Sequence, residues 1–219
     1  MPASRHDERS QRSKEVPIVG GLSDFPGIGS AMMISPALAA PFRGLLDILL
    51  VNRYEGSTLS RADRELIATA VSAGNDCFYC MDTHGAVASV LLHGQGIALG
   101  NAVAIVDNIK CGGWDGLSEK IKALIQVALC VRDHGRALGS AEVHRAIESG
   151  ATDQDVQLAV LIAAAFCMFN RIVDGFRART PSDVAAHNDR ARQIAQFGYC
   201  NPPPSAIPAV VGGATRKSK

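Results

Sequence analysis

The sequence predicts an all-α protein. Apolar residues recur at helical spacing in several segments, Ser, Thr, Asn or Asp stands before most of these segments, and Gly follows most of them. The alternation of β-branched and polar residues that marks strands is nowhere sustained. With 47% hydrophobic residues in 219, the chain can bury a sizeable core, as one domain or as two small ones.

The predicted helices follow from their start and stop signals. Ser60, with Asp63 or Glu65 in the first turn, is typical of a helix start, and Ser140 is the expected cap of a later helix. Two of the predicted helices end at Gly135 and Gly150. In order, the helices are expected over residues 37–52 (with Pro41 near the first turn), 60–74, 76–93, 97–107, 117–135, 140–150, 152–178 and 183–197, with a turn over 111–116.

The two ends differ in composition from the rest. Residues 1–17 are polar and charged, so we expect a flexible extension, and the Gly- and Pro-rich segment 18–30 is expected to be a loop. Residues 199–219 hold a Pro triplet and Gly-Gly, which predicts a tail that is free or ordered only on contact. The expected domain is 18–198.

A weak internal repeat divides this domain into two halves. An offset of 92 residues lays Thr152 over Ser60 and Asp155 over Asp63. This pattern predicts a motif-bearing half at about 37–110 and a degenerate half at about 117–198, which would keep the helices without the chemistry. Chance similarity between Ala-rich helices is the alternative.

One stretch, 65–84, holds a candidate redox site. Cys77 and Cys80 form a Cys-x-x-Cys pair, His84 follows, and Glu65 precedes. Gly74, Asn75 and Asp76 interrupt the helical pattern, so we expect a second helix to start at Asp76. Its N-terminus would favour thiolate over thiol, and at about 100° per residue both cysteines and His84 share one face. Glu65 can join them only if the two helices fold against each other.

The spacing Glu-x11-Cys-x2-Cys-x3-His resembles the signature of the alkylhydroperoxidase D (AhpD)-like proteins of the carboxymuconolactone decarboxylase superfamily. The resemblance is strongest over about 55–95 and extends to about 180. Tyr79 stands where the best-studied AhpD pattern has a histidine, which resembles the peroxidase-related branch. The resemblance implies an AhpD-like helical bundle, a homo-oligomer (trimer or hexamer), and reduction of hydroperoxides through a Cys77–Cys80 disulfide without a cofactor or metal.

The four residues supply the chemistry that such a reaction needs. A thiolate attacks the peroxide, the second thiol condenses with the sulfenic acid, and a dithiol reductant of the lipoyl or thioredoxin type reopens the disulfide. His84 can take up a proton and Glu65 can orient it. The helix dipole favours Cys77 as the attacking residue, whereas the resemblance assigns that role to Cys80, which is also nearer His84. We expect Cys80 to attack.

Composition narrows the compartment and the partners. A net charge of +1 without a basic or acidic block argues against nucleic acid, and no apolar run reaches the length of a membrane span. The N-terminus lacks an apolar signal region, and the six cysteines are too dispersed for a disulfide scaffold. A cytoplasmic protein with mostly reduced thiols is expected.

Several alternatives stay open at this stage. Cys77, Cys80 and His84 could bind zinc, although no second Cys or His pair is available, or the cysteines could be a small buried pair. The chain could also be a cofactor-free lyase of the carboxymuconolactone type, or a non-enzymatic oligomer that responds to redox state. Tyr79 is expected in a pocket wall, and Asn170 and Arg171 in a pocket or at a subunit contact.

Overall fold

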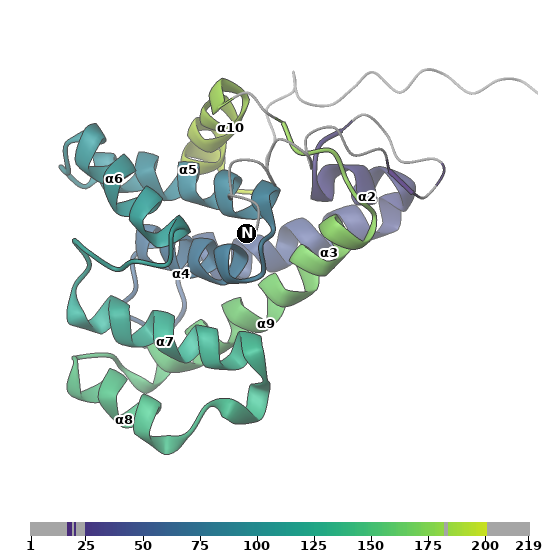
Figure 1. Ribbon diagram of the computed structural model, residues 1–219. Coiled ribbons are helices and arrows are strands. Elements are labelled where there is room, and N and C mark those ends of the chain that lie inside the picture. Colours follow the sequence, from purple (N-terminus) through teal and green to yellow (C-terminus); the bar gives the residue numbers. More distant parts are fainter. Residues whose placement is uncertain (1–16, 19, 21–24, 182–183, 201–219) are drawn as a thin grey trace, which may run out of the picture.

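The computed structural model describes residues 17–18, 20, 25–181 and 184–200 of the chain. In this part of the chain every regular element is a helix, so the predicted all-α class is confirmed (Figure 1). The helices are α2 (Ile28–Ile34), α3 (Pro36–Leu46), a π-helical turn η1 (Asp47–Val51), α4 (Arg61–Gly74), α5 (Phe78–Gly94), α6 (Leu99–Lys110), α7 (Glu119–Asp133), a 3₁₀ turn η2 (Gly135–Ala137), α8 (Ser140–Glu148), α9 (Asp153–Gly175) and α10 (Val184–Phe197).

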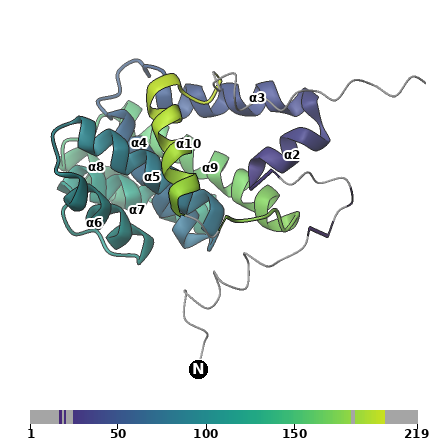
Figure 2. The same ribbon diagram turned by 90° about the horizontal axis from the view of Figure 1, so that it is seen from above.

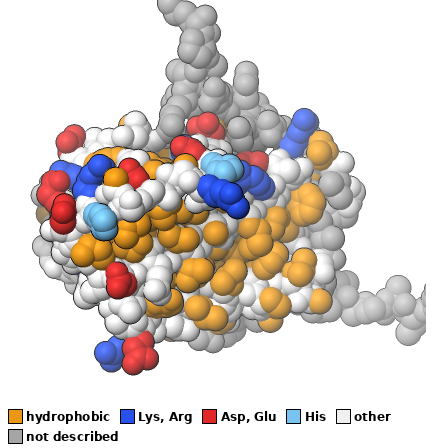
Figure 3. Space-filling model, turned by 90° about the horizontal axis from the view of Figure 1, so that it is seen from below, with side chains coloured by type: hydrophobic (Ala, Val, Ile, Leu, Met, Phe, Trp, Pro, Cys, Tyr) orange, Lys and Arg blue, Asp and Glu red, His pale blue; other side chains and the backbone are white. Residues whose placement is uncertain are grey.

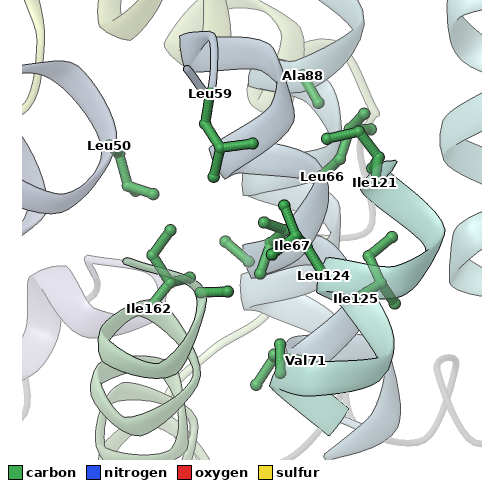
Figure 4. Packing of buried hydrophobic residues seen from close by; sticks show 14 of the residues in the cluster. Leu50, Leu59, Leu66, Ile67, Val71, Ala88, Ile121, Leu124, Ile125 and Ile162 are labelled. Carbon is green, nitrogen blue, oxygen red and sulfur yellow. The ribbon is translucent and has the colours of Figure 1, made fainter. Parts of the chain in front are cut away.

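Helix α4 forms the centre of the bundle. It packs against α5, α6, α7, α9 and η1, and α10 closes over α5 from the other side (Figures 1 and 2). From Arg64 to Ala73 every α4 side chain is buried, as expected for a helix with neighbours all round. Figure 4 shows the packing at its heart, where Leu66 and Ile67 of α4 meet Leu124 of α7 and Ile162 of α9.

The break between α4 and α5 is present, but the second helix starts later than predicted. It begins at Phe78 with Cys77 as its N-cap, not at Asp76. Asp76 instead adopts the left-handed conformation (φ 54°), and the amides of Asp76 and Cys77 bond back to the carbonyls of Ala73 and Ser72. This is a Schellman ending, in which a residue after the helix turns left-handed to satisfy the last carbonyls.

The two segments that the 92-residue offset relates begin in the same way. Ser60 and Asp63 form a capping box at the start of α4, and Thr152 and Asp155 form one at the start of α9. The similarity ends further along, because α9 continues through the position at which α4 breaks off. The division into two halves therefore stays a prediction, supported only by this shared start.

The starts of α2 and α8 also differ from the sequence-based expectation. Within the predicted loop 18–30, α2 begins at Ile28. It can begin there because Gly27 takes a left-handed conformation (φ 57°) and lies so close to the Tyr79 ring that a Cβ would overlap it. The cap of α8 is Gly139 rather than Ser140. The expected extension 1–17 and the tail from 201 onward lie outside the described residues, except for Pro17.

One face of the molecule is unusually apolar. Several exposed hydrophobic side chains come from α2, α3, η1 and α9, which contact one another. Figure 3 shows a face of the molecule on which hydrophobic side chains outnumber charged ones. The exposed side chains of these four elements include Met33, Leu38, Ile48, Leu161 and Met168. Within the described residues only α9 is long and apolar enough to cross a membrane, and 56% of its apolar window is buried in the bundle, as for a core helix.

The start of α9 depends on one buried carboxylate. Asp155 accepts hydrogen bonds from Ser57 Oγ, the Thr58 amide and Thr58 Oγ1, each at 2.7 Å, besides its bonds to Thr152. Burial alone would raise the pKa of Asp155, but these donors outweigh it and lower the pKa to about 2. The bonds therefore connect the start of α9 to the loop that leads into α4.

We predict that Asp155→Asn lowers the free energy of unfolding by about 2 kcal/mol at pH 7, which is the size of the depressed pKa expressed as energy. A depressed pKa stabilises the fold above the unfolded value of 3.8, and this stabilisation is lost as the pH falls through about 2. The difference between the free energies of unfolding of wild type and variant, measured with urea, should therefore shrink as the pH falls from 5 to 2. Asp153→Asn, exposed in the same turn, is the control, and a difference independent of pH would contradict the account.

Candidate active site

Both cysteines of the pair lie at the N-terminus of α5 and are buried, Cys77 completely and Cys80 to 4% exposure. They share a small apolar cluster with Val173 and Ala178. The Cys77 thiol hydrogen-bonds to Cys80, and this bond, followed by burial and the nearby charge of Cys80, raises the pKa of Cys77 well above its usual range. Cys77 is thus held as a thiol that donates toward its neighbour.

Glu65 and His84 are in contact, because the two helices that carry them fold against each other. Glu65, on α4, is fully buried, and its Oε2 lies 2.8 Å from Nδ1 of His84 on α5. An ionised carboxylate can only accept hydrogen bonds, so Nδ1 carries the ring proton and Nε2 is left as the acceptor. Phe166 packs edge-on against the imidazole, with ring centroids 4.6 Å apart, and fixes its plane.

A third polar residue, Tyr199, completes this group and was missed by the sequence analysis. Its hydroxyl donates to Glu65 Oε1 at 2.8 Å and lies 3.1 Å from His84 Nδ1, while its ring stacks on the imidazole. Burial, followed by the charge of Glu65, raises the pKa of Tyr199 well above its usual range, so the phenol stays protonated. Tyr199 stands at the start of a Pro-rich segment that carries no helical pattern, and no sequence signal pointed to it.

The backbone that carries Tyr199 is held by Asp47 in η1. Asp47 accepts from the amides of Tyr199 at 2.6 Å and Cys200 at 3.0 Å, one on each carboxylate oxygen. Gly198 makes the turn possible: its φ is 75°, and a Cβ there would lie 2.9 Å from Asp47. Tyr199 and Cys200 are therefore fixed to the domain.

A cavity of about 270 Å³ opens beside this group. Cys80, His84 and Tyr199 line it, whereas Cys77 does not. Tyr79 also lines it, as predicted for a pocket wall, and burial raises the pKa of Tyr79 to about 12, which argues against a role as an acid. Of the two cysteines, Cys80 is the one that a molecule in the cavity can reach.

Asn170 and Arg171 do not line this cavity. Asn170 is buried and accepts from Asn75 while donating to Ser72, so it ties α9 to the end of α4. Arg171 is exposed and bonds to the Cys167 carbonyl of its own helix. Neither residue lies in this pocket, and the other expectation, a contact with a neighbouring subunit, stays a prediction. A polar residue on an apolar helix also finds partners at a neighbouring helix end.

The other cysteines lie outside the site. Cys130 and Cys167 are half-buried rather than in the core, and Cys111 and Cys200 are exposed. Within the described ranges, no group of three or more His, Cys, Asp and Glu side chains could hold a metal ion.

We predict that Tyr199→Phe lowers the free energy of unfolding by about 1–3 kcal/mol, because buried Glu65 Oε1 loses its phenol donor. The measurement is urea unfolding at pH 7, followed by far-UV circular dichroism. Tyr54→Phe is the matched control, because Tyr54 is half-buried and its hydroxyl bonds to no described side chain. This substitution should change the free energy of unfolding by no more than about 0.5 kcal/mol. Equal unfolding midpoints for the two variants would contradict the assigned bond.

Comparison with known proteins agrees with the resemblance seen in the sequence. Residues 38–90, which include Glu65 and both cysteines, match the model of the carboxymuconolactone decarboxylase family. No curated protein sequence matches the chain significantly.

Two solved structures share the fold. One is an uncharacterized peroxidase-related protein from Silicibacter sp. TM1040, with a TM-score of 0.61 and 19% identity over 76% of this chain and 81% of that one. The other is an alkylhydroperoxidase AhpD core, an uncharacterized peroxidase-related protein from Ralstonia eutropha JMP134, with a TM-score of 0.64 and 23% identity over 85% and 90%. The family match covers the segment that holds the motif, and the two structures show that the chain has the AhpD-like fold.

Proposed function

We propose that the chain is a thiol peroxidase in which Cys80 reduces hydroperoxides and Cys77 resolves the product. One observation carries the proposal: Cys80 lines the cavity next to His84, whose other ring nitrogen is bound to the buried carboxylate of Glu65. A thiol, a base and a group that orients the base are the parts of an activated nucleophile.

The proposed cycle begins with proton transfer. His84 Nε2 accepts the Cys80 proton, and Glu65 stabilises the resulting imidazolium through Nδ1. The Cys80 thiolate attacks the distal peroxide oxygen, the O–O bond breaks, and the leaving alkoxide takes the proton from His84 to leave as alcohol. Cys80 is then a sulfenic acid, oxidised by two electrons.

The second step forms the disulfide. The sulfur of Cys77 attacks the Cys80 sulfenic acid, an S–S bond forms, and the hydroxyl leaves with the Cys77 proton as water. Residues three apart on a helix are neighbours, so this bond needs only local movement. A dithiol of the lipoyl or thioredoxin class would supply the two electrons that return both thiols.

The arrangement also favours one assignment of the two cysteines. The helix dipole alone favours Cys77, which is the N-cap of α5. Complete burial and the bond to Cys80 oppose ionisation of Cys77, and it does not line the cavity. These local effects outweigh the dipole, whose contribution is about 0.3–1 kcal/mol at an exposed site.

We also propose that the protein works in the cytoplasm as a homo-oligomer, a trimer or hexamer. The apolar side chains of α2, α3, η1 and α9 support assembly, because exposed apolar patches of this kind mark interaction sites.

The family match favours one alternative, a cofactor-free lyase, because the matching model is named for a decarboxylase. Lyase chemistry has no need of the two thiols, so activity that survives Cys77→Ser/Cys80→Ser would support it.

We predict that one equivalent of cumene hydroperoxide removes two of the six thiols of the reduced protein, and that peptide mapping finds a Cys77–Cys80 disulfide. Cys77→Ser should instead accumulate a sulfenic acid on Cys80, because the resolving thiol is absent. Cys80→Ser should lose almost all reactivity, and Cys130→Ser, on α7, should behave as wild type. A sulfenic acid only on Cys77 in Cys80→Ser would overturn the cysteine assignment, and no thiol loss in wild type would overturn the peroxidase proposal.

A further inference from the structure

We propose that the cavity beside Cys80 selects organic hydroperoxides that carry a carboxylate, which Arg43 and Arg190 bind while the apolar body fills the rest. The proposal rests on the peroxidase function above and adds the class of substrate.

Most of the cavity wall is apolar. Side chains from α2, α3, α9 and α10 surround the space, and a volume of about 270 Å³ lies just below the range of about 300–1,000 Å³ that is typical of small-molecule sites. Such a site fits one compact organic molecule and gives little affinity for hydrogen peroxide, which has no apolar surface. The apolar residues include Phe25, Ile28, Met32, Leu46, Phe169 and Ile194.

Two arginines interrupt this wall. Arg43 is on α3 and Arg190 is on α10, and both are half-buried. Neither forms an ion pair with any described residue, although Arg192 on the same helix pairs with Asp189. No described Asp or Glu lines the cavity. The charge of Arg190 is felt inside the site, where it opposes the rise in the pKa of Tyr79 and of Tyr199.

Cations that have no ion-pair partner among the described residues, and that lie beside an apolar cavity, have a physical consequence. A partly desolvated guanidinium without an anion is costly, and a ligand carboxylate that binds there removes that cost. Arginine also matches a carboxylate geometrically, because its planar N–H groups can bind both oxygens. A ligand anchored by its carboxylate would be oriented as well as bound, with its hydroperoxide free to reach Cys80.

Binding of compounds without a peroxide tests this site independently of the chemistry. The ligands are 4-isopropylbenzoate and its neutral counterpart 4-isopropylbenzamide, titrated into the full reduced chain by calorimetry. We expect the carboxylate to bind at least about tenfold more tightly than the amide, since hydrogen bonds to charged groups contribute about 1.5–3 kcal/mol.

Arginine variants then assign the effect. Arg43→Gln and Arg190→Gln should each weaken carboxylate binding about tenfold or more and leave amide binding unchanged, which also shows that the cavity is intact. Arg192→Gln, exposed on α10 and paired with Asp189, should bind both ligands as wild type does. Equal affinity of wild type for the two ligands, or selectivity that survives in both arginine variants, would overturn the proposal.

A second assay applies the same comparison to the reaction. Cumene hydroperoxide and its para-carboxylate differ only by the added carboxylate group. The carboxylate should oxidise Cys80 at least about tenfold faster in wild type but not in Arg190→Gln. If cumene hydroperoxide reacts and its carboxylate is no faster, the substrate class is wrong while the peroxidase function stands. If neither reacts but carboxylate-selective binding holds, the peroxidase function is wrong, and with it the assignment of hydroperoxides as the ligand class.

Discussion

The site depends on the hydrogen bond between Glu65 and His84. Glu65 is a fully buried carboxylate in the central helix, and a buried charge is stable only when its oxygens are bonded. His84 binds one oxygen and Tyr199 the other. This requirement couples three separate parts of the chain: α4 and α5 must pack closely, and the segment after α10 must return to the core. The same bond occupies Nδ1 of His84, and the imidazole lines the same cavity as Cys80.

Each support of this bond has its own local cause. The Schellman ending at Asp76 turns the chain so that α5 can fold back along α4, and it places Cys77 and Cys80 at the start of the new helix. Asp47 holds the backbone of Tyr199 through two amide bonds. Phe166, from α9, fixes the imidazole plane. The buried group is thus surrounded by helices, which suits the proposed site, where a proton donor and a thiol must be held in place.

Sequence patterns predicted the helices well, because caps and glycine stops act over a few residues. Fixed spacing also singled out the four residues of the motif, whose catalytic roles stay a prediction. The capping box of Ser60 and the break after Gly74 were both recognisable. Contacts between segments that lie far apart in the chain could not be recognised in the sequence. Tyr199 follows Glu65 by 134 residues, and the packing of α10 on α5, with the bonds to Asp47, brings them together. The pairing of Asn170 with Asn75 and the placement of Arg43 and Arg190 around one cavity have the same long-range origin.

The most direct test of the account is the rate at which cumene hydroperoxide oxidises Cys80 at pH 7 in Glu65→Gln, compared with wild type and the exposed control Glu148→Gln. The side chain keeps its size, but the charge that orients His84 and stabilises its protonated form is lost. The account predicts a fall of at least about tenfold in Glu65→Gln alone, less than the about 10²–10⁴-fold of a general base itself, because the variant loses the group that orients the base and not the base. An unchanged rate in a variant with a wild-type circular dichroism spectrum would show that the buried carboxylate has no part in activating Cys80.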